Sequence, residues 1–297
     1  MQLNQYIEHV EDVYTREKSV DVSILRLDKL HPIVSGNKYF KLKYYFQEAI
    51  REGKTTLVTF GGYYSNHLHA AAYACREQGL QSIGCIKGLE PKVLNDTLKE
   101  CIKYGMELKF IPPDSFAEFQ KEFQKNITPE VMMVPMGGYD ARGMMGASEI
   151  LNFDEAGSYD YIIAAGGTGT MAAGLLLKLD CNQKLILFSA VKNNHSLHKE
   201  IYALHENLID KQNQLDIQFD FHFGGYGKSN QILFDAMNWF FDQHGIPTDF
   251  VYTGKMIAGF YTLLQHDYFK NGSNILLIHS GGLQGNRSIQ SGKLNFQ

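Results

Sequence analysis

Short runs of aliphatic and β-branched residues alternate with longer amphipathic segments along most of the chain. The runs predict β-strands, and the segments with apolar residues three or four positions apart predict α-helices. The expected strands are 55–60, 82–86, 107–111, 160–165, 184–191, 218–223 and 274–280. The expected helices are 67–79, 93–105, 116–124, 170–179, 195–208, 230–245 and 255–269. This alternation predicts an α/β fold with parallel strands and helices on both faces of the sheet.

Five apolar runs, four of the strands above and a further expected strand at 131–136, are followed by pairs of glycines, which suggests a shared crevice. The pairs are Gly61 and Gly62, Gly137 and Gly138, Gly166 and Gly167, Gly224 and Gly225, and Gly281 and Gly282. Glycine allows a sharp turn and a close approach of the backbone to a ligand. Ligands of open parallel sheets bind at the carboxyl ends of the strands. Tight strand-to-helix turns alone would explain one or two pairs, whereas five favour a common binding site.

The glycine-rich segment AAGGTGTMAAG contains a G-x-G-x-x-A pattern in Gly167, Gly169 and Ala172. A dinucleotide fold would also require an acidic residue after the next strand. That strand ends in Ser-Ala-Val at 189–191, which argues against a nicotinamide cofactor. What remains is a helix N-terminus with the Thr168 and Thr170 hydroxyls, which suits one phosphate. The alternative is a glycine loop without a ligand.

The segment GGYYSNH at 61–67 allows two interpretations. Ser65 and Asn66 are good N-capping residues for the helix that follows, and capping alone would explain them. The same hydroxyl and free N–H groups could instead bind a carboxylate, with Ser65 placed for proton transfer. The residues alone do not decide between capping and carboxylate binding.

Three lysines in SGNKYFKLKYYFQEAI, residues 35–50, differ in their helical phase. The apolar positions of this segment are Leu42, Tyr45, Phe46, Ala49 and Ile50. Extended backwards, this stripe includes Lys38, whereas Lys41 lies on its flank and Lys43 faces solvent. A lysine on an apolar face pairs with an anion, lowers its pKa or forms an imine, unless its head snorkels to water. Periodicity alone does not decide which of these states Lys38 adopts.

Composition narrows the class of protein further. The 297 residues carry a formal net charge of −4, with 44% hydrophobic and 20% charged residues. This is ordinary globular composition, and without a basic stripe it disfavours nucleic-acid binding. The four cysteines show neither a C-x-x-C pair nor a zinc spacing, and no His or acidic cluster suggests another metal. The absence of a secretory signal or membrane-length apolar run predicts a cytoplasmic protein.

Seven motifs occur in an order that resembles one group of pyridoxal-phosphate enzymes. They are SGNKYFKL, GGYYSNH, VPMGG, the glycine-threonine loop, GGYG, VYTGK and IHSGG. The group is the tryptophan-synthase-β-like branch (fold type II) that contains 1-aminocyclopropane-1-carboxylate deaminase and D-cysteine desulfhydrase. The resemblance extends over about residues 20 to 285. It implies two open, mainly parallel twisted sheets flanked by helices, and a homodimer. A larger cofactor-binding domain of residues 1–48 plus 153–297 would enclose a smaller α/β domain of residues 49–152.

The same resemblance implies a role for individual residues. Lys38 is similar to the lysine that forms a Schiff base with pyridoxal 5'-phosphate. Gly167, Thr168, Gly169 and Thr170 would hold the phosphate, assisted by Lys41, while Asn66 would bind the pyridine 3-oxygen and Ser280 would lie near the pyridine nitrogen. Ser65, Asn66, His67, Tyr226 and Tyr252 would face a small amino-acid substrate, with Lys38, Ser65, Tyr226 and Tyr252 as the catalytic residues.

One position bears on the reaction. Cyclopropane deaminases of this group have VYEGK with a glutamate near the pyridine nitrogen, whereas this chain has VYTGK, in which the resemblance implies that Thr253 contacts the cofactor. A neutral hydroxyl supports a weaker electron sink, which suffices for a good leaving group such as thiolate. We therefore expect β-elimination from D-cysteine to pyruvate, ammonia and sulfide. The alternatives are conversion of the cyclopropane substrate to 2-oxobutanoate and ammonia, or a non-catalytic pyridoxal-phosphate-binding protein. His69, where relatives often have arginine, and the altered phosphate loop depart from the family pattern.

Overall fold

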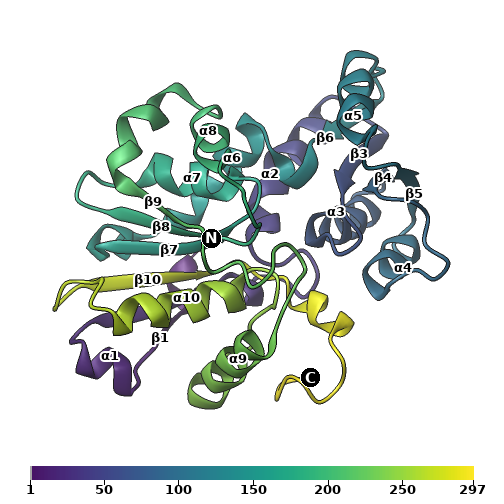
Figure 1. Ribbon diagram of the computed structural model, residues 1–297. Coiled ribbons are helices and arrows are strands. Elements are labelled where there is room, and N and C mark those ends of the chain that lie inside the picture. The colour runs from purple at the N-terminus through teal and green to yellow at the C-terminus, as the bar shows by residue number, and fades with distance from the viewer. Residues whose placement is uncertain (1) are drawn as a thin grey trace.

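The computed structural model describes residues 2–297, which form two β-sheets flanked by helices (Figure 1). The strands are β1 Ile7–His9, β2 Asp21–Arg26, β3 Thr56–Gly61, β4 Gln81–Lys87, β5 Met106–Ile111, β6 Val131–Val134, β7 Tyr161–Gly166, β8 Lys184–Ser189, β9 Leu215–Gln218 and β10 Asn274–His279. The helices are α1 Val13–Glu17, α2 Asn37–Arg51, α3 Asn66–Glu77, α4 Asp96–Lys103, α5 Phe116–Lys125, α6 Ala141–Ser148, α7 Thr170–Lys178, α8 Leu197–Tyr202, α9 Gln231–His244 and α10 Thr253–Gln265.

The larger sheet has six strands in the order β1-β2-β10-β7-β8-β9, and only β1 is antiparallel to its neighbour. The smaller sheet is parallel throughout, in the order β5-β4-β3-β6. β10, near the end of the chain, lies between β2 and β7, so that Ile275 is opposite both Val22 and Tyr161. The predicted fold class of two mainly parallel sheets is confirmed.

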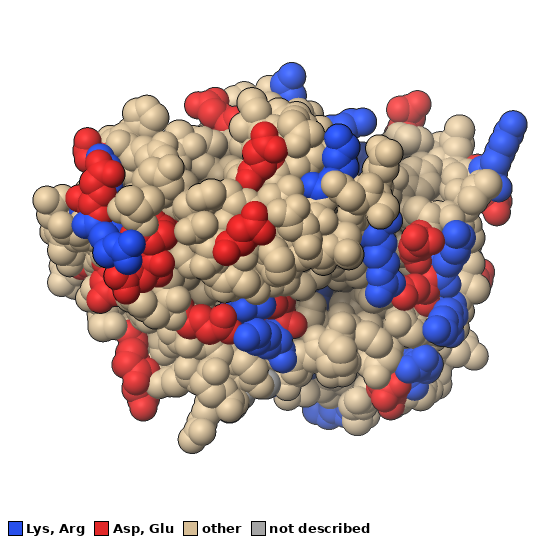
Figure 2. All heavy atoms as spheres, turned by 90° about the horizontal axis from the view of Figure 1, so that it is seen from below, with Lys and Arg blue, Asp and Glu red and all other residues tan. Residues whose placement is uncertain are grey.

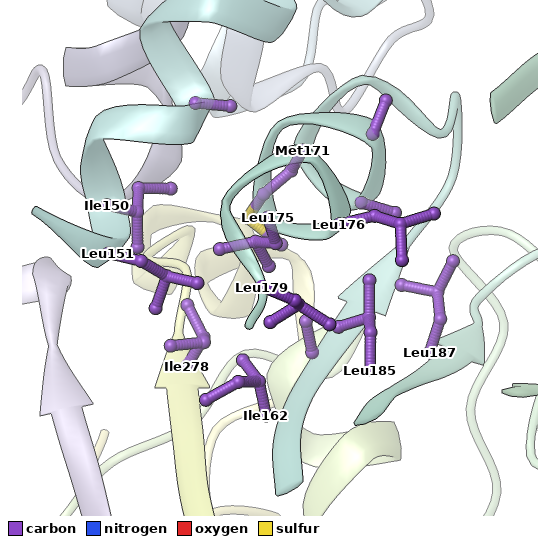
Figure 3. Packing of buried hydrophobic residues seen from close by; sticks show 14 of the residues in the cluster. Ile150, Leu151, Ile162, Met171, Leu175, Leu176, Leu179, Leu185, Leu187 and Ile278 are labelled. Carbon is purple, nitrogen blue, oxygen red and sulfur yellow. The ribbon is translucent and has the colours of Figure 1, made fainter. Parts of the chain in front are cut away.

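Buried apolar residues cover both faces of the larger sheet. Helices α6 and α7 pack on one face, where side chains from the helices meet those of β7, β8 and β10 (Figure 3). Helix α10 packs on the other face, with Phe260 and Ile257 against Ile163 and Leu277. The strands are therefore almost continuously buried, as expected of a parallel sheet covered on both sides.

The two sheets draw their strands from separate stretches of the chain. The smaller sheet uses residues 56–134, and the larger sheet uses residues on either side of this stretch. Helix α6, which was expected to belong to the smaller domain, contributes Met144 and Ala147 to the core of the larger sheet. The domain boundaries at residues 48 and 152 therefore stay a prediction.

Polar side chains define where several helices begin. The Oδ1 atoms of Asn95 and Asn230 accept hydrogen bonds from the N–H groups of Leu98 and Leu233, at the starts of α4 and α9. Asp12 and Thr15 form a capping box at α1. Such caps satisfy N–H groups that have no partner within the helix.

The structure corrects two expectations about local structure. The segment 219–225 is a turn-rich loop, because β9 ends at Gln218, so the Gly224–Gly225 pair does not follow a strand directly. The expected long helix 195–208 is the short α8 followed by a 3-10 helix, Glu206–Gln214.

Surface charge and helix length add two findings. Figure 2 shows basic and acidic side chains interspersed on one face of the molecule. Among residues 2–297, no helix combines the length and apolar character that a membrane crossing requires.

Candidate active site

A cavity of about 1220 Å³ lies at the carboxyl ends of strands from both sheets. Gly62 after β3, Gly167 after β7 and Ser280 after β10 all contribute to its wall. Most residues that the sequence singles out line this one cavity: Lys38, Lys41, Ser65, Asn66, His67, Gly167, Thr168, Gly169, Tyr226, Tyr252 and Ser280. Thr170 and Thr253 are fully buried and do not belong to the described wall.

The first turn of α2 is fixed against the end of β10. Gly36 has φ +65°, and a Cβ atom at this position would lie only 1.9 Å from the carbonyl oxygen of Ser280. The N–H of Asn37 donates to that same oxygen at 3.2 Å. A glycine is therefore required here by both space and conformation. This contact places the next residue, Lys38, inside the cavity.

Lys38 is a buried amine, with 8% of its surface exposed. Burial lowers the pKa of Lys38 to about 8, although the nearby Asp249 carboxylate acts in the opposite direction. Its Nζ atom lies 5.8 Å from the centre of the Tyr252 ring, and it donates no hydrogen bond to any group within residues 2–297. The lowered pKa gives Lys38 a larger neutral fraction than an exposed lysine has, and the neutral amine is the nucleophile.

Lys41 lies one turn further along α2 and is also buried. Its Nζ atom donates to the carbonyl oxygen of Gly137 at 3.1 Å. Burial, and secondarily the charge of Lys38, lowers the pKa of Lys41 to about 7. Lys43 points elsewhere, as its helical phase predicts, but it is paired with Glu149 at 2.6 Å. Ile50, which was expected on the apolar stripe, is 58% exposed, because it lies seven positions after Lys43 and therefore on the same outer side of α2, whereas the adjacent Ala49 is buried.

The glycine-threonine loop forms an anion-binding cradle at the start of α7. Gly169 has φ +79° and directly precedes the helix. The Thr168 and Thr170 hydroxyl oxygens are 3.0 Å apart, and Thr170 donates to the carbonyl oxygen of Gly137 at 3.4 Å. Lys41 contacts the same carbonyl, so the cation and the helix N-terminus converge. Free N–H groups, hydroxyls and a buried cation suit a phosphate.

The helix α3 begins at the opposite wall of the cavity. The Oγ atom of Ser65 accepts a hydrogen bond from the N–H of Leu68 at 3.2 Å, which confirms its capping role. Capping occupies only a lone pair, so the hydroxyl hydrogen remains available for donation. Asn66 Oδ1 accepts from the Nε2 group of Gln284 at 2.7 Å. The capping and binding interpretations are therefore compatible.

The two histidines of α3 are both committed to protein contacts. Thr59 Oγ1 donates to the carbonyl oxygen of Val134, and it lies 2.9 Å from His67 Nε2. The Thr59 hydroxyl must therefore accept from His67, which fixes a neutral Nε2–H tautomer. Burial, followed by the charges of Lys41 and Lys38, lowers the pKa of His67 to about 3. His69 Nε2 contacts Glu100 Oε2 at 2.8 Å.

Two tyrosines and a carboxylate complete the site. The rings of Tyr226 and Tyr252 meet edge to face, with their centres 6.2 Å apart. Tyr226 is 39% exposed, but partial removal of its hydroxyl from water raises the pKa of Tyr226 to about 12. Asp249 lies beneath them, fully buried, and accepts hydrogen bonds from the N–H groups of Val251, Tyr252 and Thr253. It also accepts a hydrogen bond from the Thr253 hydroxyl at 2.7 Å, so that this hydroxyl is directed away from the cavity. The predicted contact of Thr253 with a cofactor stays a prediction.

A family model described as "Pyridoxal-phosphate dependent enzyme" matches residues 14–281. The chain belongs to this family. It is therefore an enzyme whose cofactor is pyridoxal phosphate, and the resemblance found in the motifs is confirmed.

Curated relatives cover nearly the whole chain. A Thermotoga maritima protein, whose name as a 1-aminocyclopropane-1-carboxylate deaminase is marked as provisional, is 27% identical over 304 residues, covering 95% of this chain and 93% of its own. The D-cysteine desulfhydrase of Klebsiella pneumoniae is 27% identical over 302 residues, which cover 94% of this chain and 90% of the relative.

Solved structures show the same fold. A crystal structure of an ACC deaminase homologue superposes with a TM-score of 0.80 at 24% identity, covering 94% of this chain and 90% of its own. A pyridoxal 5'-phosphate-dependent aspartate racemase gives a TM-score of 0.69 at 14% identity, with 100% and 95% covered.

The cavity fits this cofactor. The buried Lys38 amine suits an aldehyde, and the α7 cradle with Lys41 suits a phosphate monoester. A Cβ atom at Gly137 would lie 2.8 Å from Thr168 Oγ1, so the loop beside the cradle leaves room only for glycine. These observations agree with a group that has an aldehyde at one end and a phosphate at the other.

Sequence reasoning missed two residues that organise the site. Asp249 is the only acid in the segment IPTDFVYTGK, and an acid amid apolar residues was a usable signal. Gln284, which contacts Asn66, is separated from it by 218 positions, and no local pattern indicates that contact.

Proposed function

We propose that this enzyme catalyses β-elimination from a small amino acid, with D-cysteine as the preferred substrate. D-Cysteine and water would give pyruvate, ammonia and hydrogen sulfide. The observation that carries the assignment to pyridoxal-phosphate chemistry is the buried Lys38 amine, which shares a cavity with a phosphate cradle. The relatives named as D-cysteine desulfhydrases support the substrate class.

The surroundings of Tyr252 support elimination over ring opening. The nearest carboxylate, Asp249, is fully buried and accepts four hydrogen bonds from protein groups, so it has no oxygen free for a ring nitrogen. The described acids that line the cavity, Glu48, Glu52, Asp140 and Glu200, belong to other segments. A ring nitrogen without a carboxylate partner gives a weaker electron sink, which is sufficient for a thiolate leaving group.

Different residues of the chain would bind the substrate, remove its Cα proton and protonate the leaving group. Bound pyridoxal phosphate supplies an electron sink for negative charge at the substrate Cα. The start of α3 holds the substrate carboxylate through its N–H groups and the Ser65 hydroxyl. Lys38 Nζ, with its lowered pKa, takes the proton from Cα. The Tyr226 hydroxyl, whose pKa lies well above neutral pH, is protonated and donates a proton to the leaving sulfur.

Cofactor binding has a direct test. The purified protein should show the visible absorption of a lysine-bound pyridoxal phosphate, and Lys38→Ala should lose that band while keeping its thermal stability. Lys43→Ala, on the outer face of the same helix, is the matched control and should keep the band. A wild-type protein that remains colourless with added cofactor would refute the proposal.

Substrate choice needs a panel of D- and L-amino acids and 1-aminocyclopropane-1-carboxylate, scored by release of 2-oxo acid. We expect D-cysteine to give the highest kcat/KM. Higher activity on the cyclopropane would favour the second candidate, a deaminase, which the name of the Thermotoga maritima relative supports. Coloured protein without any turnover would indicate a non-catalytic cofactor-binding protein. We further propose a cytoplasmic homodimer, which light scattering of the purified protein would test for assembly.

A further inference from the structure

The loop that carries Tyr226 has an unusual backbone. Gly224, Gly225 and Gly227 have φ values of +97°, +113° and +64°, and Phe223 has φ +47°. The loop lies between β9 and α9 and belongs to neither. Positive φ is ordinary for glycine, which leaves these positions conformationally free, but it is rare for phenylalanine and persists at Phe223 only because the surroundings fix the backbone there. The position of the Tyr226 ring therefore depends on what holds this loop.

Lys255 of α10 provides that contact. Its Nζ atom donates to the carbonyl oxygen of Gly225 at 2.7 Å and approaches the carbonyl oxygen of Ala190 at 3.4 Å. Ala190 directly follows β8, so one side chain connects the loop to the carboxyl end of this strand. Lys255 is 1% exposed and does not contribute to the described wall of the cavity, so it acts on a ligand only through its neighbours.

The ammonium of Lys255 is costly to bury. Burial lowers the pKa of Lys255 to about 8, and the Asp249 carboxylate opposes this. The side chain is therefore mainly charged at neutral pH, and its hydrogen bonds are of the strong, charge-assisted type. An apolar residue of the same length would avoid the cost of burying a charge but could not hold the loop.

A continuous series of contacts connects the two tyrosines to the start of α10. Asp249 fixes the start of α10, which carries Tyr252 and, one turn later, Lys255. Lys255 holds Gly225, and the next residue, Tyr226, packs against Tyr252. Each tyrosine is therefore positioned from the same helix terminus.

We propose that Lys255 is a positioning residue that holds the Tyr226 loop against the sheet and so sets where the Tyr226 hydroxyl meets the substrate. Its effect on catalysis rests on the proposed function, whereas its effect on the loop does not. The two effects are therefore tested separately.

Loop order is tested by limited trypsin digestion of the purified protein. Lys228 is exposed at the end of the loop, and mass spectrometry identifies cleavage after it. Lys255→Met should increase the rate of this cleavage about tenfold or more, because a charge-assisted hydrogen bond is lost. Lys211→Met is the matched control, since Lys211 also donates to two carbonyl oxygens, those of Leu177 and Leu179, in a different region. Equal cleavage rates in Lys255→Met and Lys211→Met would overturn the proposal.

Catalysis is tested by a double-mutant cycle with D-cysteine. Lys255→Met should lower kcat/KM about tenfold while the cofactor band remains. In a Tyr226→Phe background the same change should cost less than about twofold, because the hydroxyl being positioned is already absent. Lys255→Arg, which keeps a charged donor, should restore part of the loss. Fully additive effects would overturn the catalytic part, whereas a wild type without activity would refute the proposed function and leave the digestion result standing.

Discussion

Replacing Asp249 with asparagine tests whether this carboxylate organises the start of α10. Its Oδ2 atom accepts from the N–H groups of Val251 and Tyr252, both at 3.0 Å. In Asp249→Asn, either this oxygen or Oδ1 becomes an NH₂ group, and at least two donors lose their acceptor. Each buried donor without a partner costs about 1–3 kcal/mol, so the free energy of unfolding should fall by about 2–6 kcal/mol.

This loss converts to a shift in Tm. An unfolding entropy of about 2.1 cal/mol/K per residue amounts to about 0.6 kcal/mol/K for 297 residues, so Tm should fall by about 3–10 °C. Differential scanning calorimetry of the cofactor-free protein measures it. Asp267→Asn is the control, because Asp267 is 78% exposed in its pair with Lys18, and this pair contributes little. A Tm for Asp249→Asn within about 1 °C of the control would refute the reasoning.

Three further changes have defined outcomes. The pKa of Lys41 is lowered from 10.5 to about 7, so the unfolded chain binds more protons between these values and the cofactor-free protein should gain stability as pH rises from 7 to 10.5. Lys41→Met should flatten that rise in urea unfolding, and an unchanged slope would contradict it. Ser65→Ala removes a helix cap and should cost about 1 kcal/mol of stability, but far more in kcat/KM if the hydroxyl also serves the substrate. Comparable losses of stability and of kcat/KM would leave capping of α3 as the only role of the Ser65 hydroxyl. Gly146→Ala would place a Cβ atom 2.0 Å from the Phe40 carbonyl oxygen and should lower Tm sharply in a thermal scan, whereas Gly62→Ala meets nothing within 4 Å. Equal Tm values for both would argue against close contact of α2 and α6.

The alternation of apolar runs predicts most of the fold because burial dominates in a parallel sheet. Strands such as β7 and β10 are covered on both faces, and their continuous apolar runs are visible in the sequence. The segment 218–223, QFDFHF, alternates aromatic and polar residues, which favours a strand, but the observed strand β9 is Leu215–Gln218 and the chain turns after it. Local composition does not place this strand correctly, because β9 lies at an edge of the sheet and its position is set by pairing with β8 on one side only.

The site was predictable where helical phase or a motif carries the information. Phase separates Lys38 from Lys43, because residues on opposite faces of α2 meet different environments. Phase does not reveal that Lys255, inside a recognised motif, supports the loop of another segment. Nor does it show that Thr253 directs its hydroxyl to Asp249, since that choice depends on the backbone at the start of α10. Contacts of this kind are set by tertiary packing.

The junction of Gly36 with Ser280 has a consequence for how the enzyme matures. Residues 244 positions apart must meet before the first turn of α2 is fixed and Lys38 faces the cavity. Contacts of such separation form late, because the loop between them must first be closed. On the ribosome, β10 emerges after almost all other elements. The proposed binding of pyridoxal phosphate to Lys38 would therefore follow synthesis of the chain, and we expect a nascent chain truncated before β10 not to acquire the cofactor.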